Sequence, residues 1–91
     1  MLLTYSITVS GKVQGVYYRQ STKEKAIALN ITGTVMNKKN GDVEIIATGS
    51  KEKLDALIDW CRQRPVKAIV ENVIVKELSL QLFDRFVIQR F

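Results

Sequence analysis

The sequence contains no histidine, one cysteine and one proline among its 91 residues. The lack of histidine removes the side chain that most often acts as a general base and most often binds a transition metal. The single cysteine, Cys61, excludes an intramolecular disulfide and a cysteine-rich metal site. Any chemistry in this chain must therefore use other side chains or the backbone.

Long apolar runs are also missing. No segment approaches the length of a membrane span, and the first residues, "MLLTYSI", do not have the basic region, apolar segment and cleavage site of a signal peptide. We therefore expect a cytoplasmic protein with no membrane partner. A chain of 91 residues, 46% hydrophobic and 25% charged, predicts one small globular domain over residues 1–91.

Acidic residues are fewer than basic ones. The 14 lysines and arginines exceed the 9 aspartates and glutamates, which gives a net charge of +5, and the basic residues are scattered along the chain. This balance favours anionic partners, and it fits a small phosphorylated molecule as readily as a nucleic acid.

Hydrophobic periodicity predicts a strand followed by a helix in the first third of the chain. In "LTYSITVS", residues 3–10, apolar and polar side chains alternate as in a strand with one buried face. Ser21 and Glu24 have the spacing of a capping box, which predicts that a helix begins there. Asn30 tolerates a left-handed conformation and is expected to end it.

A second helix is predicted after Ser50, which is a typical N-cap residue. Its buried face follows the i, i+3, i+4, i+7 pattern, and the Arg64-Pro65 pair is expected to stop it. The residues of that face are Leu54, Leu57, Ile58 and Cys61.

Four further strands complete the predicted order. Residues 31–37 and 42–49 flank Asn40-Gly41, a strong hairpin signal because both residues accept positive φ. Residues 68–78 and 85–91 have the composition of two more strands. The order β-α-β-β-α-β predicts an α+β, ferredoxin-like fold, with two helices on one face of an antiparallel sheet and an extra short C-terminal strand.

The stretch "GKVQGVYYRQ", residues 11–20, joins the first strand to the first helix. Its glycines permit a compact loop whose N–H groups converge on an anion, next to a helix N-terminus that also favours negative charge. Arg19 adds a planar fork of donors suited to phosphate oxygens. The topology brings Asn37, at the end of strand 31–37, close to Gly15 and Arg19. Together these features predict a phosphate-binding site.

The same stretch resembles the signature of the acylphosphatase family, Gly-x-Val-Gln-Gly-Val-x-Phe-Arg, with Tyr18 in place of the phenylalanine. A second family signature is matched by Gly33, Asn37, Gly41, Val43 and Glu44. The resemblance covers the whole chain, including Arg64-Pro65 and the segment Phe86, Val87 and Ile88. It departs at Thr34, where the family has an aromatic residue, and at Asn30, where it has glycine.

This resemblance implies that Arg19 binds the phosphate and that Asn37 orients the attacking water. It also implies that the substrate contacts the backbone of Gln14, Gly15, Val16, Tyr17 and Tyr18. An acyl phosphate releases a carboxylate, which leaves without being protonated, so the missing histidine is no obstacle. The expectation is a monomeric acylphosphatase that acts on a small acyl phosphate, releases inorganic phosphate, and uses neither metal nor cofactor.

Two other readings compete with this one. The RNA-recognition fold shares the order β-α-β-β-α-β, but its third strand is rich in aromatic residues, and "DVEIIATG" has none. A non-catalytic domain that binds a peptide and keeps the family's fold is the other alternative. Of the two adjacent tyrosines, Tyr17 and Tyr18, we expect one ring to pack in the core.

Overall fold

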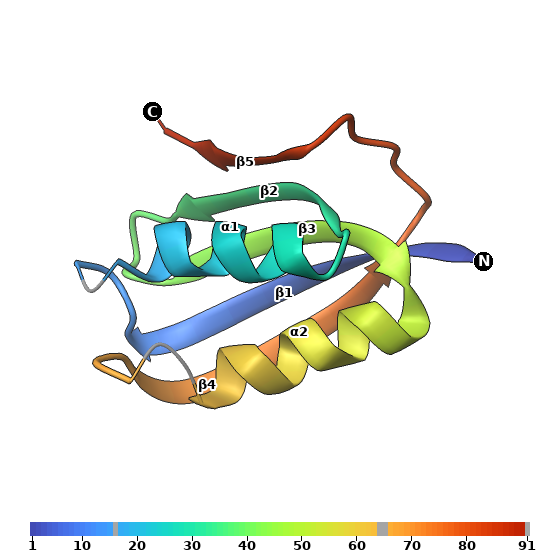
Figure 1. Cartoon of the computed structure of the whole chain (residues 1–91). Helices are drawn as coiled ribbons and strands as arrows, with labels where there is room; N and C mark the ends of the chain where they lie inside the picture. Colours follow the sequence, from blue (N-terminus) through green and yellow to red (C-terminus); the bar gives the residue numbers. More distant parts are fainter. Residues whose placement is uncertain (16, 64–65, 91) are drawn as a thin grey trace.

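The computed structural model describes residues 1–15, 17–63 and 66–90. In these ranges the chain forms β1 (Leu2–Lys12), α1 (Tyr18–Ala28), β2 (Thr32–Asn37), β3 (Val43–Ser50), α2 (Lys51–Gln63), β4 (Ile69–Leu78) and β5 (Phe86–Gln89). The strand order is β4-β1-β3-β2-β5, with β5 parallel to β2 and the other neighbours antiparallel. Both helices lie on one face of the sheet (Figure 1). The predicted ferredoxin-like α+β fold with an extra C-terminal strand is confirmed.

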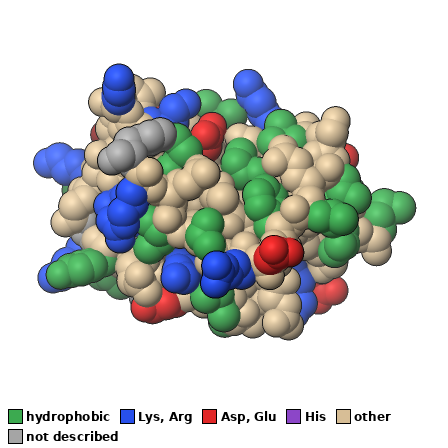
Figure 2. Space-filling model, turned by 90° about the horizontal axis from the view of Figure 1, so that it is seen from above, with side chains coloured by type: hydrophobic (Ala, Val, Ile, Leu, Met, Phe, Trp, Pro, Cys, Tyr) green, Lys and Arg blue, Asp and Glu red, His purple; other side chains and the backbone are tan. Residues whose placement is uncertain are grey.

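The core lies between that sheet face and the helices. Helix α1 packs over β2 and β5, and α2 packs over β1, β3 and β4. The strands bury a largely aliphatic surface that includes Ile7, Val9, Val35, Val43 and Ile45. No helix within the described ranges combines the length and apolar character that crossing a membrane requires. On the face that is seen from above, lysine and arginine side chains are spread out and form no single block (Figure 2).

Helix α2 follows its predicted pattern closely. Its N-terminus is capped by Ser50, whose Oγ accepts a hydrogen bond from the N–H of Lys53 at 3.3 Å. Its four predicted core residues are all buried: Leu54, Leu57, Ile58 and Cys61. The helix extends to Gln63, and the Arg64-Pro65 pair that was predicted to stop it lies outside the described residues.

Helix α1 begins at Tyr18, so the capping box predicted at Ser21 and Glu24 is wrong. The N–H of Ser21 donates to the carbonyl of Tyr17 at 2.9 Å, which places Ser21 inside the first turn. The N-cap is Tyr17, without a side-chain capping bond. Burial of the Tyr18 ring fixes the start of the helix, so tertiary packing outweighs the local capping signal. Asn30 adopts the expected left-handed conformation, with φ 58°.

The β2–β3 hairpin forms where it was predicted. The N–H of Lys38 donates to the carbonyl of Asp42 at 2.8 Å, and the N–H of Gly41 donates to the carbonyl of Lys38 at 3.1 Å. Positive φ is found at Gly41 (97°) and not at Asn40, so only one residue of the pair uses its left-handed tolerance. The Asn40 side chain instead accepts a hydrogen bond from the N–H of Asp42 at 3.0 Å.

Two buried threonines hold the connection between β4 and β5. The hydroxyl oxygens of Thr4 and Thr48 lie 2.6 Å apart. Gln81 donates its N–H to Thr4 at 2.9 Å and accepts from Thr48 at 2.7 Å. These bonds pin the connection to β1 and β3, so β5 is held as the outer strand beside β2.

The burial of α2 leads to a stability prediction. Leu57 is fully buried, so Leu57→Ala is expected to lower the free energy of unfolding by about 2–5 kcal/mol, a large share of a small domain's stability. Urea denaturation measures this change. Asp59→Ala, on the exposed face of the same helix, is the control. A loss below about 0.5 kcal/mol for Leu57→Ala would show that the helix does not depend on this contact.

Candidate active site

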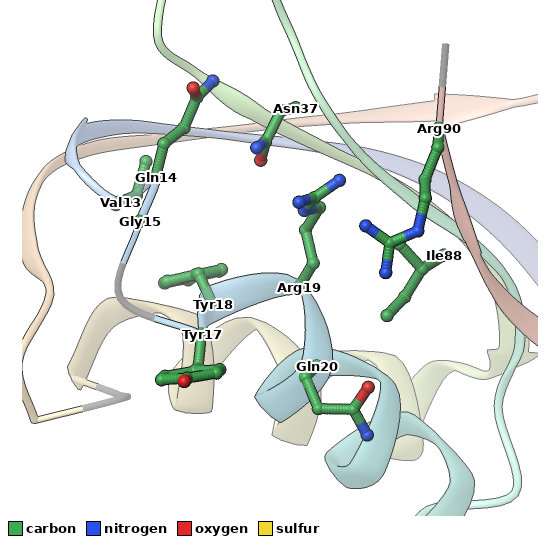
Figure 3. Close-up of a pocket in the computed structure, with 10 residues that line it drawn as sticks. All are labelled: Val13, Gln14, Gly15, Tyr17, Tyr18, Arg19, Gln20, Asn37, Ile88 and Arg90. Atoms are coloured by element: carbon green, nitrogen blue, oxygen red, sulfur yellow. The ribbon is translucent and has the colours of Figure 1, made fainter.

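A pocket of about 450 Å³ opens where the β1–α1 loop meets the ends of β2 and β5. Its lining brings together six of the seven residues predicted for the site: Gln14, Gly15, Tyr17, Tyr18, Arg19 and Asn37 (Figure 3). Val16, the seventh, lies outside the described residues. Segments far apart in the sequence thus meet at one edge of the sheet.

Two of the loop residues that the structure describes are left-handed. Gly15 has φ 76°, and a Cβ added there would meet nothing within 4 Å, so the position needs glycine for its backbone conformation and not for space. Tyr17 has φ 60° and ψ 25°. This left-handed residue is followed by helical Tyr18, a sequence of conformations that turns consecutive N–H groups toward one side. The N-terminal N–H groups of α1 add to the same anion-binding surface.

The two tyrosine side chains have opposite environments. The side chain of Tyr17 is 83% exposed, and Figure 3 shows its ring directed away from Arg19 and Asn37. Tyr18 is buried, donates its hydroxyl to the carbonyl of Cys61 at 2.9 Å, and packs edge-on against Trp60. Burial also raises the pKa of Tyr18 above its ordinary value, so the phenol stays neutral. The prediction that one ring packs in the core is confirmed, and this ring anchors the loop to α2.

The Gln14 side chain connects the loop to the hairpin that follows Asn37. Its Nε2 donates to the carbonyls of Lys38 and Asp42, both at 2.9 Å. Because both amide donors are used in this bridge, the side chain of Gln14 holds the loop and the hairpin at a fixed spacing.

Arg19 and Asn37 approach each other from different elements. Arg19 is the second residue of α1, and Asn37 is the last residue of β2. Figure 3 shows the guanidinium directed toward the Asn37 amide. The Oδ1 atom of Asn37 is buried and has no hydrogen-bond partner among the described residues. A buried acceptor without a partner costs about 1–3 kcal/mol, and in a pocket it indicates a place for a ligand or a water molecule.

Thr34, the position where the family has an aromatic residue, does not face the pocket. It pairs with Ile46 on β3 and Val87 on β5. Side chains alternate along a strand, so Thr34 and Asn37 lie on opposite faces of the sheet. This departure therefore leaves the surroundings of Asn37 intact.

Four further residues line the pocket and were not predicted for the site: Val13, Gln20, Ile88 and Arg90. Ile88 and Arg90 reach it because β5 runs parallel to β2, which brings the C-terminal ends of both strands to the same edge. Figure 3 shows the Arg90 guanidinium extending toward the same space as Arg19. The only sequence feature that pointed to these residues was the short strand predicted near the chain end. The sequence did not reveal which strand it pairs with or in which direction.

Cys61 and the acidic residues form no separate site. Cys61 is fully buried, and burial raises the pKa of its thiol to about 12, so it stays protonated in the core as predicted. Within the described ranges, His, Cys, Asp and Glu side chains do not gather into a group of three that a metal ion requires.

Comparisons with known proteins agree with this geometry. The model of the family described as Acylphosphatase matches residues 5–88. A relative named Acylphosphatase from Marinobacter nauticus is 50% identical over 83 residues, which are 90% of each chain. The structure of an acylphosphatase from Coxiella burnetii is 38% identical, with a TM-score of 0.93, and the match covers 97% of this chain and 93% of that one. An acylphosphatase structure from Bacillus subtilis is 33% identical with the same TM-score, over 99% and 100% of the two chains. The chain therefore belongs to the acylphosphatase family, whose function is the hydrolysis of acyl phosphates.

Proposed function

We propose that this pocket hydrolyses the carboxyl–phosphate bond of acyl phosphates and that Arg19 and Asn37 are its catalytic residues. The backbone of residues 14–18 and the Arg19 guanidinium hold the phosphate, and Asn37 orients the attacking water. The observation that carries the proposal is the buried Oδ1 of Asn37, which has no partner among the described residues and lies beside Arg19 at the glycine loop.

The phosphate has candidate donors from two elements of the pocket. Gly15 and Tyr17, which have left-handed backbone, line the pocket together with Arg19, and in this proposal the loop N–H groups and the Arg19 guanidinium bind the phosphate. Fixed donors of this kind stabilise the charge that spreads over the phosphoryl oxygens in the transition state. The Gln14 bridge and the buried Tyr18 ring keep this backbone in place before substrate arrives.

Asn37 supplies the acceptor for the nucleophile. A water that donates to Oδ1 is held at the end of β2, next to the phosphate bound by Arg19. As its oxygen bonds to phosphorus, the bond from phosphorus to the acyl oxygen breaks, and the carboxylate leaves with that electron pair. The protons of the water pass to the orthophosphate and the solvent. The leaving carboxylate needs no proton, so the reaction needs no general acid, and the role of Asn37 is to position the water for attack.

The reaction is expected to need no metal, because positive charge is already provided by Arg19 in the pocket lining. Hydrolysis of an aryl-acyl phosphate should therefore proceed at an unchanged rate in chelator. Orthophosphate should inhibit competitively, because it occupies the phosphoryl site. Release of inorganic phosphate measures both effects. Activity that is lost in chelator and returns with magnesium would contradict the metal-free mechanism, and noncompetitive inhibition would place the anion elsewhere.

We also propose that the protein acts as a cytoplasmic monomer on small-molecule substrates. Six of the seven residues predicted for the site already meet within this chain, which supports a site that needs no residue from a partner subunit. Light scattering on active protein at assay concentration tests the oligomeric state.

A further inference from the structure

A second hollow, of about 520 Å³, continues from the active-site pocket along the space between α1 and β5. It shares three lining residues with that pocket: Gln20, Ile88 and Arg90. We call it the α1–β5 groove. It leads away from the phosphate loop, so it lies where the part of a substrate beyond the phosphoryl group has room to extend.

The groove has an apolar floor and a basic rim. Apolar surface comes from Ile27, which is 54% exposed, together with the half-buried Val87 and Ile88. The charged members of the described lining are Lys23 and two arginines, Arg85 and Arg90.

Acidic side chains are absent from the described lining of the groove. The nearby carboxylate of Glu24 accepts a hydrogen bond at 3.1 Å from Nε2 of Gln20, which is a lining residue. The ion pairs among the described residues, Lys38–Glu44 and Lys51–Asp55, involve none of the groove's cations. The groove is therefore suited to an anion carried on an aliphatic chain.

Two cations of the groove lie on elements that also line the active-site pocket. Lys23 follows Arg19 by four residues of α1, which is roughly 6 Å along the helix axis. Arg90 lies on the opposite wall, at the point where pocket and groove meet. The parallel pairing of β5 with β2 and the Gln81 bonds to Thr4 and Thr48 hold that wall in place.

We propose that the α1–β5 groove binds the acyl part of the substrate and favours acyl phosphates with a short aliphatic chain that ends in a second anionic group. The chain lies on Ile27 and Ile88, and the terminal carboxylate or phosphate is bound by Arg90 and Lys23. The proposal rests on the proposed function, since it concerns the part of the same substrate that does not react.

Two substrates of equal length test this preference. Glutaryl phosphate and pentanoyl phosphate have the same five-carbon chain, but one ends in a carboxylate and the other in a methyl group. We expect kcat/KM to be roughly 5- to 30-fold higher for glutaryl phosphate at low salt, because partly exposed charge-assisted contacts contribute modestly. The ratio should fall as ionic strength rises. An acyl phosphate of similar length that ends in a phosphonate shows which anion binds better, and a preference for either supports the groove.

Variants then assign the effect to the groove. In the double variant Lys23→Gln, Arg90→Gln the ratio between the two substrates should fall toward one. Lys25→Gln, on the same helix but outside the groove lining, should keep it. Equal kcat/KM for both substrates in the unmodified protein, or a ratio that survives the double variant, would overturn the proposal. If neither compound is hydrolysed, the proposed function itself fails and the groove proposal falls with it.

Discussion

Replacing Arg19 with alanine is expected to lower kcat/KM by a factor on the order of 10²–10³ or more and to weaken orthophosphate binding in parallel. Arg19 lines the pocket with the loop residues, and in the proposed mechanism its guanidinium meets the phosphoryl group in both the ground state and the transition state. Its loss therefore removes binding energy and stabilisation of the developing charge together. Steady-state kinetics and calorimetric titration with orthophosphate measure the two effects.

The matched controls for this prediction separate charge from geometry. Arg19→Lys keeps the positive charge but loses the planar fork of donors, so it should recover phosphate binding in part and turnover less well. Arg62→Ala removes an exposed arginine of α2, outside the pocket lining, and should change neither. Near-normal turnover in a folded Arg19→Ala protein would show that the backbone loop alone stabilises the phosphate.

The fold was largely predictable because most of its elements carry periodic signals of their own. The alternation in β1 and the apolar stripe of α2 with its Ser50 cap are local patterns that the structure keeps. The start of α1 was misplaced because its cause is not local. Tyr18 is drawn into the core by Trp60 and the Cys61 carbonyl, more than forty residues away in sequence, and no capping rule contains that contact.

The site was predictable in part for a similar reason. Gly15, Arg19 and Asn37 are joined by a β-α-β topology that the sequence order implies, and the structure brings them into one pocket. The Gln14 side chain can act as a bridge only because the carbonyls of Lys38 and Asp42 lie within hydrogen-bond distance of its Nε2. The approach of Arg90 depends on β5 pairing parallel to β2. Neither arrangement leaves a periodic or compositional trace.

The structure also bears on the competing nucleic-acid reading. On the sheet face away from the helices, β3 presents Glu44 and Ile46, and Thr48 on the same face is buried and bonded to Gln81. None of these side chains can stack on a base. The arginines that come together are in the concave site at the strand ends, which fits a small phosphorylated ligand better than an extended polymer.

Asn37→Ala is expected to lower kcat severely, by a factor on the order of 10² or more, and to leave orthophosphate affinity nearly unchanged. The buried Oδ1 of Asn37 has no partner among the described residues, and we propose it as the acceptor for the attacking water. The hydrogen bond between Asn37 and the water is expected to stabilise the transition state, in which the new bond to phosphorus forms. The loop and Arg19 are expected to bind the phosphate without this hydrogen bond. Kinetics, orthophosphate titration and circular dichroism on the same preparation measure turnover, binding and folding.

Asn37→Asp provides the sharper comparison, because it keeps an oxygen acceptor of the same shape but adds a negative charge beside the phosphate. This variant should weaken orthophosphate binding, which Asn37→Ala should not, since like charges at close range repel. Retained turnover in Asn37→Ala would remove the water-positioning role. If Asn37→Ala instead loses phosphate binding as fully as Arg19→Ala, then Asn37 belongs to the phosphate site, and the water must be held by another group.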